Sequence, residues 1–319
     1  MKISVIIITY NRANILKNTL ECLARQTIKP FEVIVVDNFS TDKTKDVIYD
    51  FGKKLPIKYV SEKRNNLAVL RNLGIKLSKG KIIAFLDDDT RVSREWIYNL
   101  KNYFNGNRTV DCVCGYLGVI KKDYLTEANR NITESIFVMA NKFANSIGML
   151  SKLKAFLKTQ IKDFFHSQVN FTGTTTMAMK RDVFEKIGLF DENFAHVEEF
   201  DFQLRMLKNN IKMVLLPFRI DHYYKNTLSG IVKQYFSYGF YEYLSYVKHR
   251  RDKNLRRFMT NIEKSFLVAA FFPFLVTMRY LILNKKDMKL ELIPIIFFAT
   301  LIARFCFALG TIYSHYKIS

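Results

Sequence analysis

The alternation of short apolar runs with amphipathic helical patterns constrains the fold of this chain more than any other feature. The apolar runs cover residues 3–9, 31–36, 57–60 and 81–86, and the helical patterns cover residues 14–26, 41–51 and 67–78. Continuous apolar runs are typical of strands buried on both faces, and intervening helices return the chain so that the next strand starts in parallel. We therefore predict an α/β fold with a Rossmann-like, mostly parallel sheet and flanking helices.

Acidic side chains follow two of these predicted strands. Asp37 comes after residues 31–36, and an Asp-Asp-Asp run from Asp87 to Asp89 comes after residues 81–86. The carboxyl ends of parallel strands meet at one edge of a sheet, which is where such sheets bind ligands. If the backbone stays extended, Asp87 and Asp89 point to one side and Asp88 to the other. Two carboxylates on one side can hold a divalent cation, and a solvated acidic turn is the alternative.

The glycine-rich phosphate motifs of two large nucleotide-binding classes are missing from the sequence. No GxGxxG pattern follows the first predicted strand, and no GxxxxGK[ST] pattern occurs. Their absence argues against dinucleotide oxidoreductases and P-loop enzymes, so a bound nucleotide would be held by side chains such as Asp37. The net charge of +21 favours anionic partners. Four scattered cysteines without paired spacing argue against a zinc site or a disulfide framework.

Residues 171–223 carry the remaining candidate groups. Residues 171–179 have strand composition, and residues 213–216 are predicted as one more strand, ended by Pro217. A second acidic group lies at the start of a predicted helix between them: Glu198, Glu199 and Asp201. Acids in a first helical turn are stabilised by the helix dipole, which is a structural explanation for this group. His222 follows the last predicted strand, where it is either a hydrogen-bonded structural residue or a metal ligand.

Five segments within residues 1–225 together resemble the family 2 glycosyltransferases of GT-A fold. They are SVIIITYNR at 4–12, VVDNFSTD at 35–42, LRNLG at 70–74, FLDDD at 85–89 and EEFDFQLR at 198–205. The resemblance implies a GT-A fold. It also implies an enzyme that transfers a sugar, with inversion, from a nucleotide-diphosphate donor.

The resemblance further implies roles for individual residues. The donor-binding set would be Thr9, Tyr10, Asn11, Arg12, Asp37, Arg71, Asp87 and Asp88. A divalent cation, Mn²⁺ or Mg²⁺, would be held by Asp89 as the main ligand, with Asp87 and His222 completing the metal site. Asn38 stands where the family usually has a second acid, which leaves the choice among UDP-, GDP- and dTDP-sugars open.

The chemistry of this transfer needs a cation and a base. A nucleotide diphosphate leaves with growing negative charge, which a divalent cation neutralises. Inversion by a single displacement needs one base to take the proton of the acceptor hydroxyl. The resemblance places Glu199 where the family usually has an Asp as the base. Because Glu reaches one methylene further, Glu198 and Asp201 remain rival bases.

The last fifth of the chain has the composition of a membrane anchor. Residues 248–264 carry seven Lys or Arg and two acids, and two apolar stretches follow at 265–283 and 292–313. Stretches of this length predict a C-terminal hairpin of two transmembrane helices. A helix pair lying in the membrane interface and a docking surface for a partner chain are the alternatives.

The expected domain organisation follows from these segments. We expect a catalytic domain at residues 1–225, with a nucleotide-binding half at 1–105 and an acceptor half at 106–225. The acceptor half would contain a basic amphipathic helix at 145–165, and residues 226–264 would be a basic linker beside the membrane. The N-terminal sequence has no signal-peptide pattern, so we expect a membrane-associated protein whose catalytic domain lies on the cytoplasmic side.

The expected acceptor is a hydroxyl of a lipid-linked glycan at the membrane, so membrane lipid is an expected partner. One alternative is a polyprenyl-phosphate glycosyl synthase, whose acceptor is a lipid phosphate that hardly needs a base. Another is a non-catalytic membrane scaffold that binds nucleotides or carbohydrates. Nucleic acid is not an expected partner, because much of the positive charge clusters beside the predicted membrane segments.

Overall fold

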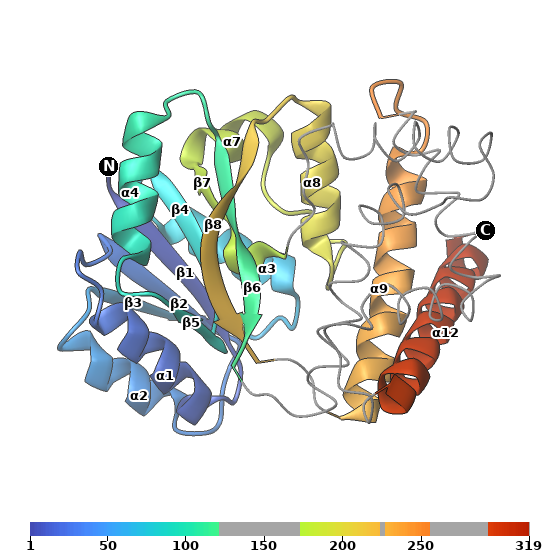
Figure 1. Ribbon diagram of the computed structural model, residues 1–319, viewed down its shortest axis with the longest axis horizontal. Coiled ribbons are helices and arrows are strands. Elements are labelled where there is room, and N and C mark those ends of the chain that lie inside the picture. The colour runs from blue at the N-terminus through green and yellow to red at the C-terminus, as the bar shows by residue number, and fades with distance from the viewer. Residues whose placement is uncertain (121–172, 224–226, 256–292, 319) are drawn as a thin grey trace. The chain divides into compact units, whose positions relative to one another are not determined.

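The computed structural model describes residues 1–120, 173–223, 227–255 and 293–318 (Figure 1). The chain divides into two compact units. The first comprises Met1–Ile120 and Asn170–Tyr223, and the second comprises Lys121–Val169 and Tyr224–Ser319. The sheet and all of the predicted site residues belong to the first unit. The predicted amphipathic helix at 145–165 and the first predicted span at 265–283 lie outside the described residues.

The first half of the sheet is parallel and follows the alternation read from the sequence. Its strands are β1 (Ile3–Thr9), β2 (Glu32–Asp37), β3 (Ile57–Ser61) and β4 (Ile82–Asp87). The helices between them are α1 (Ala13–Ala24), α2 (Thr44–Gly52) and α3 (Leu67–Leu77). The strands lie in the order β3-β2-β1-β4, all parallel. Because the chain moves outward through β2 and β3 and then returns to β4, a switch point falls between β1 and β4, where such folds bind ligands.

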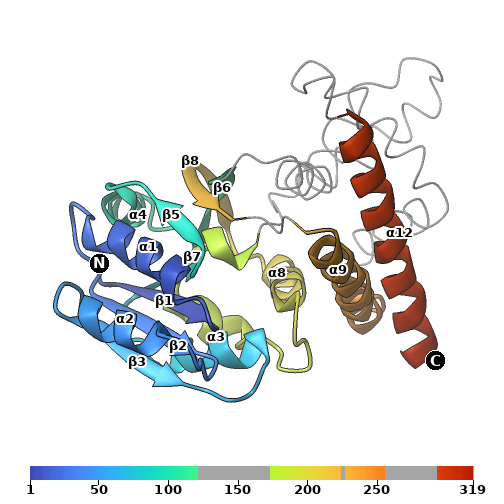
Figure 2. The same cartoon turned by 90° about the horizontal axis from the view of Figure 1, so that it is seen from below.

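Helices cover both faces of this parallel half. Figures 1 and 2 show α1 and α2 side by side, and with α4 (Trp96–Gly106) they enclose the main apolar core. Val5 and Ile7 of β1 are fully buried in that core. On the other face, Phe85 of β4 meets Phe184 and Phe190 edge to face. Successive side chains of each strand point to opposite faces of the sheet, and both faces are buried in an apolar core. This is why the strands appear in the sequence as continuous apolar runs.

The second half of the sheet is mixed. Its elements are β5 (Thr90–Val92), β6 (Cys112–Val119), the short 3₁₀ turn η1 (Thr174–Thr176), β7 (Ala178–Lys180) and β8 (Met213–His222). β7 runs antiparallel to β4 and β6, β8 runs parallel to β6, and β5 runs antiparallel to β8. The eight strands lie in the order β3-β2-β1-β4-β7-β6-β8-β5. The fold is therefore mixed α/β.

The strand predicted to end at Pro217 continues to His222. The pairing of β8 with β6 shifts register between Cys114 and Tyr116, opposite the segment that contains Pro217. A proline lacks the N–H that a regular ladder requires, and an irregularity of this kind accommodates it. Beyond the irregularity, β8 pairs with β5, and His222 lies opposite Thr90, directly after Asp89. The continuation past Pro217 thus brings His222 to the Asp-Asp-Asp run.

The second unit contains two long helices, α9 (Leu228–His249) and α12 (Ile293–Ile318), which pack against each other. Their contact is close, because a Cβ added at Gly239 of α9 would clash with the backbone carbonyl of Phe307 of α12. Ala303, Phe307 and Ala308 of α12 are buried.

The predicted transmembrane hairpin is wrong. None of the helices in the described part of the chain has both the length and the apolar character needed to cross a membrane. Residues of the second predicted span, 292–313, instead lie largely in α12, where part of their apolar surface packs on α9. The apolar composition that favoured a span here serves helix–helix packing.

Candidate active site

The candidate site lies at the carboxyl edge of the parallel strands. Thr9, the last residue of β1, lies opposite Asp37 at the end of β2, and Ile8 lies opposite Asp87 at the end of β4. The three strand ends therefore meet beside the switch point of the sheet. Asp37 and Asp87 share one edge, as the sequence predicted.

Asp87, Asp89 and His222 form a cluster of possible metal ligands. His222 Nε2 lies 3.0 Å from Asp89 Oδ1 and 3.8 Å from Asp87 Oδ2. Each of the three residues offers one ligand atom, and these atoms all lie within 4.8 Å of one another. Asp87 also accepts a hydrogen bond from the Thr175 hydroxyl of η1. The predicted metal set is thus brought together by β4, the turn after it and β8.

Asp88 points away from this cluster. Its carboxylate accepts hydrogen bonds from Thr9 Oγ1 at 2.8 Å and from Arg12 Nη1 at 2.9 Å. Asp88 is only 4% exposed, and burial raises its pKa to about 6 despite the nearby Arg12 charge. In this structure the side chains of Thr9 and Arg12 both bind Asp88, and the predicted contact of these three residues with the donor stays a prediction.

Arg12 also contacts the metal cluster. The same Nη1 atom lies 2.9 Å from Asp89 Oδ2, so one nitrogen bridges two neighbouring carboxylates. Asp89 is thereby held through Oδ2 by Arg12, while its Oδ1 faces His222. Burial alone would raise the pKa of Asp89. The hydrogen bonds and charges of His222 and Arg12 lower it by more, so the pKa of Asp89 lies below its ordinary value. Burial alone would lower the pKa of His222. The hydrogen bond and the negative charge of Asp89 raise it by more, so the pKa of His222 lies above its ordinary value.

The donor atoms of the cluster suit a divalent cation such as Mn²⁺. Two carboxylates and one imidazole supply oxygen and nitrogen ligands, a combination that this class of ion accepts. One oxygen of Asp89 is oriented by a partner outside the cluster, which is the usual arrangement around ligating carboxylates.

Asp37 is fixed within its own loop. Its carboxylate accepts bonds from the Ser40 N–H at 3.1 Å and from the Tyr59 hydroxyl at 3.0 Å, and the residue is 1% exposed. The neighbouring Asn38 donates to the carbonyls of Glu62 and Arg64, which ties the loop after β2 to the loop after β3. The amide at position 38 therefore has a structural role that a carboxylate could not fill, because both of its bonds are donated to carbonyls.

The loops after β1 and β2 are also joined to each other. Asn11 adopts a left-handed backbone conformation with φ of +50°. Its side-chain oxygen accepts from the Thr41 N–H at 2.7 Å, and its own N–H donates to the Ser40 hydroxyl at 2.8 Å. Tyr10, beside it, is 57% exposed. Of these two predicted donor-binding residues, Asn11 holds the loop and Tyr10 remains open to a ligand.

Arg71 connects the Asp-Asp-Asp run to the second acidic group. It is 6% exposed in α3, forms an ion pair with the fully buried Glu198, and lies 3.9 Å from Asp87 Oδ1. A buried ion pair costs stability when one partner is removed, because the remaining charge is left uncompensated. The Arg71–Glu198 pair therefore ties the first turn of α8 (Glu198–Lys208) to α3.

The three rival bases differ in their surroundings. Glu198 pairs with Arg71, and Asp201 pairs with Arg205 at 2.9 Å. Among the side chains that the structure describes, Glu199 is the one of the three without an ion-pair partner, and it is partly exposed. Burial raises the pKa of Glu199, the Arg71 charge opposes that rise, and the charge of Asp87 adds to it. A carboxylate that is unpaired and has a raised pKa is suited to accept a proton.

The backbone before α8 is strained. Val197 has φ of +58°, in the left-handed region. For a β-branched residue this conformation is unfavourable, and such outliers occur where the surrounding structure imposes them. It leads directly into Glu198 and Glu199, so the strain lies at the entry to the second acidic group.

Sequence reasoning missed two groups at this site. Thr175 donates a hydrogen bond to Asp87 from η1, which lies within the segment 171–179 that was predicted to have strand structure; the signal for it was the Thr-rich run from Thr174 to Thr176. His196 is partly exposed near Arg71, and burial together with the Arg71 charge lowers its pKa. Nothing in the sequence separated His196 from a loop residue.

Comparison with known proteins identifies the family of the chain. Residues 4–188 match glycosyl transferase family 2. Hyaluronan synthase of Pasteurella multocida is 30% identical over 222 residues, which cover 65% of this chain and 23% of that protein. An uncharacterized glycosyltransferase of Methanocaldococcus jannaschii is 27% identical over 291 residues, 88% of this chain and 89% of that protein. The chain thus spans less than a third of the hyaluronan and chondroitin synthases that it matches.

Solved structures share the fold. A mannosyltransferase of Pyrobaculum calidifontis, solved with GDP-Man and Mn²⁺, aligns with a TM-score of 0.66 at 15% identity, covering 100% of this chain and 88% of that chain. TarS of S. aureus, residues 1–349 with UDP-GlcNAc, aligns with a TM-score of 0.55 at 16% identity, covering 100% and 92%. The family match extends over more than half of the 319 residues, and the chain therefore belongs to glycosyl transferase family 2 and is a glycosyltransferase.

Proposed function

We propose that the chain transfers a sugar from a nucleotide-diphosphate donor to an acceptor hydroxyl with inversion at the sugar carbon. One observation carries this proposal: Glu199, which has no ion-pair partner among the described side chains, lies near the cluster of Asp87, Asp89 and His222, close enough for the charge of Asp87 to raise its pKa. A cation site and one base are the two elements that a single displacement requires. GDP-Man and UDP-GlcNAc in the structural neighbours support a nucleotide-sugar as the donor.

Asp87, Asp89 and His222 would hold the divalent cation. When bound there, such an ion supplies Lewis-acid neutralisation of the diphosphate leaving group. Arg12 keeps Asp89 oriented through Oδ2 and leaves Oδ1 for the cluster. Thr175 similarly fixes Asp87, so both carboxylates are positioned by neighbours before any ligand arrives.

Glu199 would take the proton of the acceptor hydroxyl. Glu198 cannot readily do so because it is fully buried and paired with Arg71, and Asp201 is fully buried and paired with Arg205. The raised pKa of Glu199 increases its affinity for a proton, which favours its action as a base while it is ionised. The Arg71–Glu198 pair holds the helix that presents it.

The proposed acceptor is a hydroxyl of a glycan. The names of the hyaluronan and chondroitin synthases among its relatives support an acceptor of this class. The net charge of +21 supports a glycan on an anionic carrier, such as a lipid diphosphate.

The test is sugar transfer and donor binding measured on Glu199→Gln. The amide keeps the shape of the side chain but cannot accept the proton, so transfer should fall by about a hundredfold or more, while nucleotide affinity stays within about twofold of wild type. Glu185→Gln is a matched control, because Glu185 is exposed on α7 (Arg181–Ile187). Transfer at the wild-type rate by Glu199→Gln would remove Glu199 from this role.

A panel of UDP-, GDP- and dTDP-sugars, each with Mn²⁺ and with EDTA, tests the donor class and the cation. Heat unfolding is the readout, since a ligand that binds only the folded state raises the melting temperature in proportion to its affinity. We expect one nucleotide to stabilise the protein in the presence of Mn²⁺ and to do so less in EDTA. Stabilisation by none of the nucleotides would contradict the proposed donor.

A further inference from the structure

The loop after β2 contains a side chain in an unfavourable state, Phe39. Its φ is +59°, in the left-handed backbone region, and 52% of the residue is exposed. The left-handed region disfavours bulky residues, which is why glycine and asparagine usually occupy it. An exposed aromatic ring also forgoes the stabilisation that burial would give it. A loop selected for stability alone would have a different residue at this position.

The loop that carries Phe39 is held firmly at the edge of the site. Asn38 donates to the Glu62 carbonyl at 2.8 Å, and Ser40 accepts from the Asn11 N–H at 2.8 Å. The residues on either side of Phe39 are therefore tied to the loops after β3 and β1. Phe39 also lies two positions after Asp37, the last residue of β2. Its strained conformation is thus imposed by its neighbours at the carboxyl edge of three parallel strands.

The ring itself is oriented by a cation. Lys63, from the loop after β3, places its Nζ 4.7 Å from the centroid of the Phe39 ring. A cation over one face of a ring is attracted to its π electrons. Because the residue is still 52% exposed with one face covered by Lys63, a large part of the ring surface remains open to a ligand.

We infer that Phe39 binds the nucleobase of the donor by stacking, with Lys63 fixing the plane of its ring. This inference rests on the proposed function, since it concerns the nucleotide part of the proposed donor. Every nucleobase has a flat π face, and stacking on an aromatic side chain is favourable for all of them. Phe39 would then contribute affinity for the nucleoside without distinguishing pyrimidines from purines by hydrogen bonding.

Three variants separate the ring from the strain. Phe39→Leu removes the ring and keeps an apolar side chain, Phe39→Tyr keeps the ring, and Phe39→Asn removes the ring and suits the left-handed backbone. Calorimetry on the full chain with Mn²⁺ measures the affinity for UDP, for GDP, for dTDP and for inorganic pyrophosphate. Pyrophosphate has no base, so it reports on the cation and phosphate part of the site alone.

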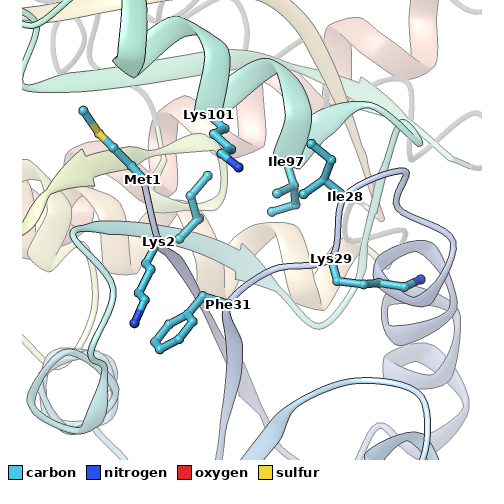
Figure 3. Close-up of a pocket in the computed structure, with 8 residues that line it drawn as sticks. Met1, Lys2, Ile28, Lys29, Phe31, Ile97 and Lys101 are labelled. Atoms are coloured by element: carbon cyan, nitrogen blue, oxygen red, sulfur yellow. The ribbon is translucent and has the colours of Figure 1, made fainter.

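The chain offers a closely matched control at the other end of β2. Phe31 is also exposed, at 38%, and Lys2 lies 4.4 Å from the centroid of its ring. Figure 3 shows Phe31 and Lys2 beside a pocket of about 190 Å³ at the amino end of the strands. Phe31→Leu therefore removes an exposed ring with the same kind of cation contact, away from the candidate site.

We expect Phe39→Leu and Phe39→Asn to weaken the nucleoside diphosphate that wild type binds by about ten- to a hundredfold. Pyrophosphate should bind as in wild type, and Phe39→Tyr and Phe31→Leu should bind the nucleotide normally. Phe39→Asn should also melt about 2 °C higher than wild type because the backbone strain is relieved.

Two results would overturn the inference while leaving the proposed function intact: normal nucleotide affinity in Phe39→Leu, or an equal loss of nucleotide and pyrophosphate affinity. A lower melting temperature for Phe39→Asn would assign the ring a structural role and overturn it as well. If wild type binds none of UDP, GDP and dTDP, the proposed function fails, and the inference fails with it.

Discussion

Replacing Asp88 with Asn should make the protein progressively more stable than wild type as the pH rises. Asp88 is 4% exposed, and its pKa is raised from 3.8 to about 6 by burial. At 1.36 kcal/mol for each pKa unit, a rise of about two units corresponds to about 3 kcal/mol. That free energy is the cost of ionising Asp88 in the folded protein rather than in the unfolded chain.

The direction of the effect follows from proton binding. Between about pH 4 and about pH 6, folded Asp88 retains its proton while the unfolded chain has lost it. The folded state therefore binds more protons, and the free energy of unfolding of wild type falls as the pH rises through this window. The Asn side chain of Asp88→Asn cannot ionise, so the free energy of unfolding of this variant does not fall in this pH window through position 88. Its stability relative to wild type should grow by about 3 kcal/mol from about pH 4 to about pH 7.

Urea unfolding followed by tryptophan fluorescence measures this difference. Trp96 is the only tryptophan in the sequence, and it is 2% exposed in the core of the first unit. The measurement is made in EDTA, so that no cation contributes, and Asp50→Asn is the control because its side chain is 77% exposed. A difference between Asp88→Asn and wild type that is constant over this pH range, or that shrinks as the pH rises, would refute the reasoning.

Three further predictions concern the site. The rate of transfer by wild type should fall as the pH drops through the raised pKa of Glu199, because only the ionised carboxylate can act as base; a pH–rate profile without an acidic limb would contradict this. Asp89→Asn should weaken Mn²⁺ binding by about tenfold or more in electron paramagnetic resonance titrations, while Asp88→Asn should bind Mn²⁺ nearly normally; equal losses would contradict the division of roles. Glu198→Gln should lower the free energy of unfolding by about 3 kcal/mol because it removes the closer of the two carboxylates that pair with the buried Arg71 and leaves only Asp87 at 3.9 Å, and a urea titration that finds the small loss of a surface pair would contradict the assigned role.

The parallel half of the sheet could be predicted because its signals are local. Each strand from β1 to β4 is an unbroken apolar run, and each helix between them has its own apolar stripe. The mixed half gave weaker signals. β6 contains Gly115 and Gly118, and β8 contains Pro217, so neither has the composition of a regular strand. Their pairing depends on an irregular register between residues distant in the sequence, which no local pattern encodes.

The C-terminal prediction failed for a different reason. Hydrophobicity alone does not distinguish a helix that spans a bilayer from one that packs against another helix. Here α12 packs along α9, with the glycine at position 239 allowing the close contact. α9 covers part of the apolar surface of α12, and that partner could not be recognised from the α12 segment itself.

The separation of the acids matches the prediction, but the backbone that produces it and the partners of the acids do not follow from the sequence pattern. Asp88 points away from Asp87 and Asp89 as expected, yet β4 ends at Asp87 and the next two residues form a turn, so a turn and not strand alternation sets their directions. The contacts of Arg12 and Arg71 were not predictable, because they depend on how loops and helices distant in the sequence meet. Both arginines are engaged with carboxylates of the protein, and their expected contact with the donor stays a prediction.

These arginines determine the charge that the site offers to a ligand. The contacts described above join four carboxylates, those of Asp87, Asp88, Asp89 and Glu198, to the guanidinium groups of Arg12 and Arg71. With His222 neutral and all four acids ionised, this group carries two uncompensated negative charges. A divalent cation between Asp87 and Asp89 balances them, which favours a doubly charged ion over a monovalent one. The arginines therefore support the proposed cation from outside the ligand set: they neutralise Asp88 and Glu198, which are not ligands, and each also contacts one of the two ligand carboxylates, Asp89 or Asp87.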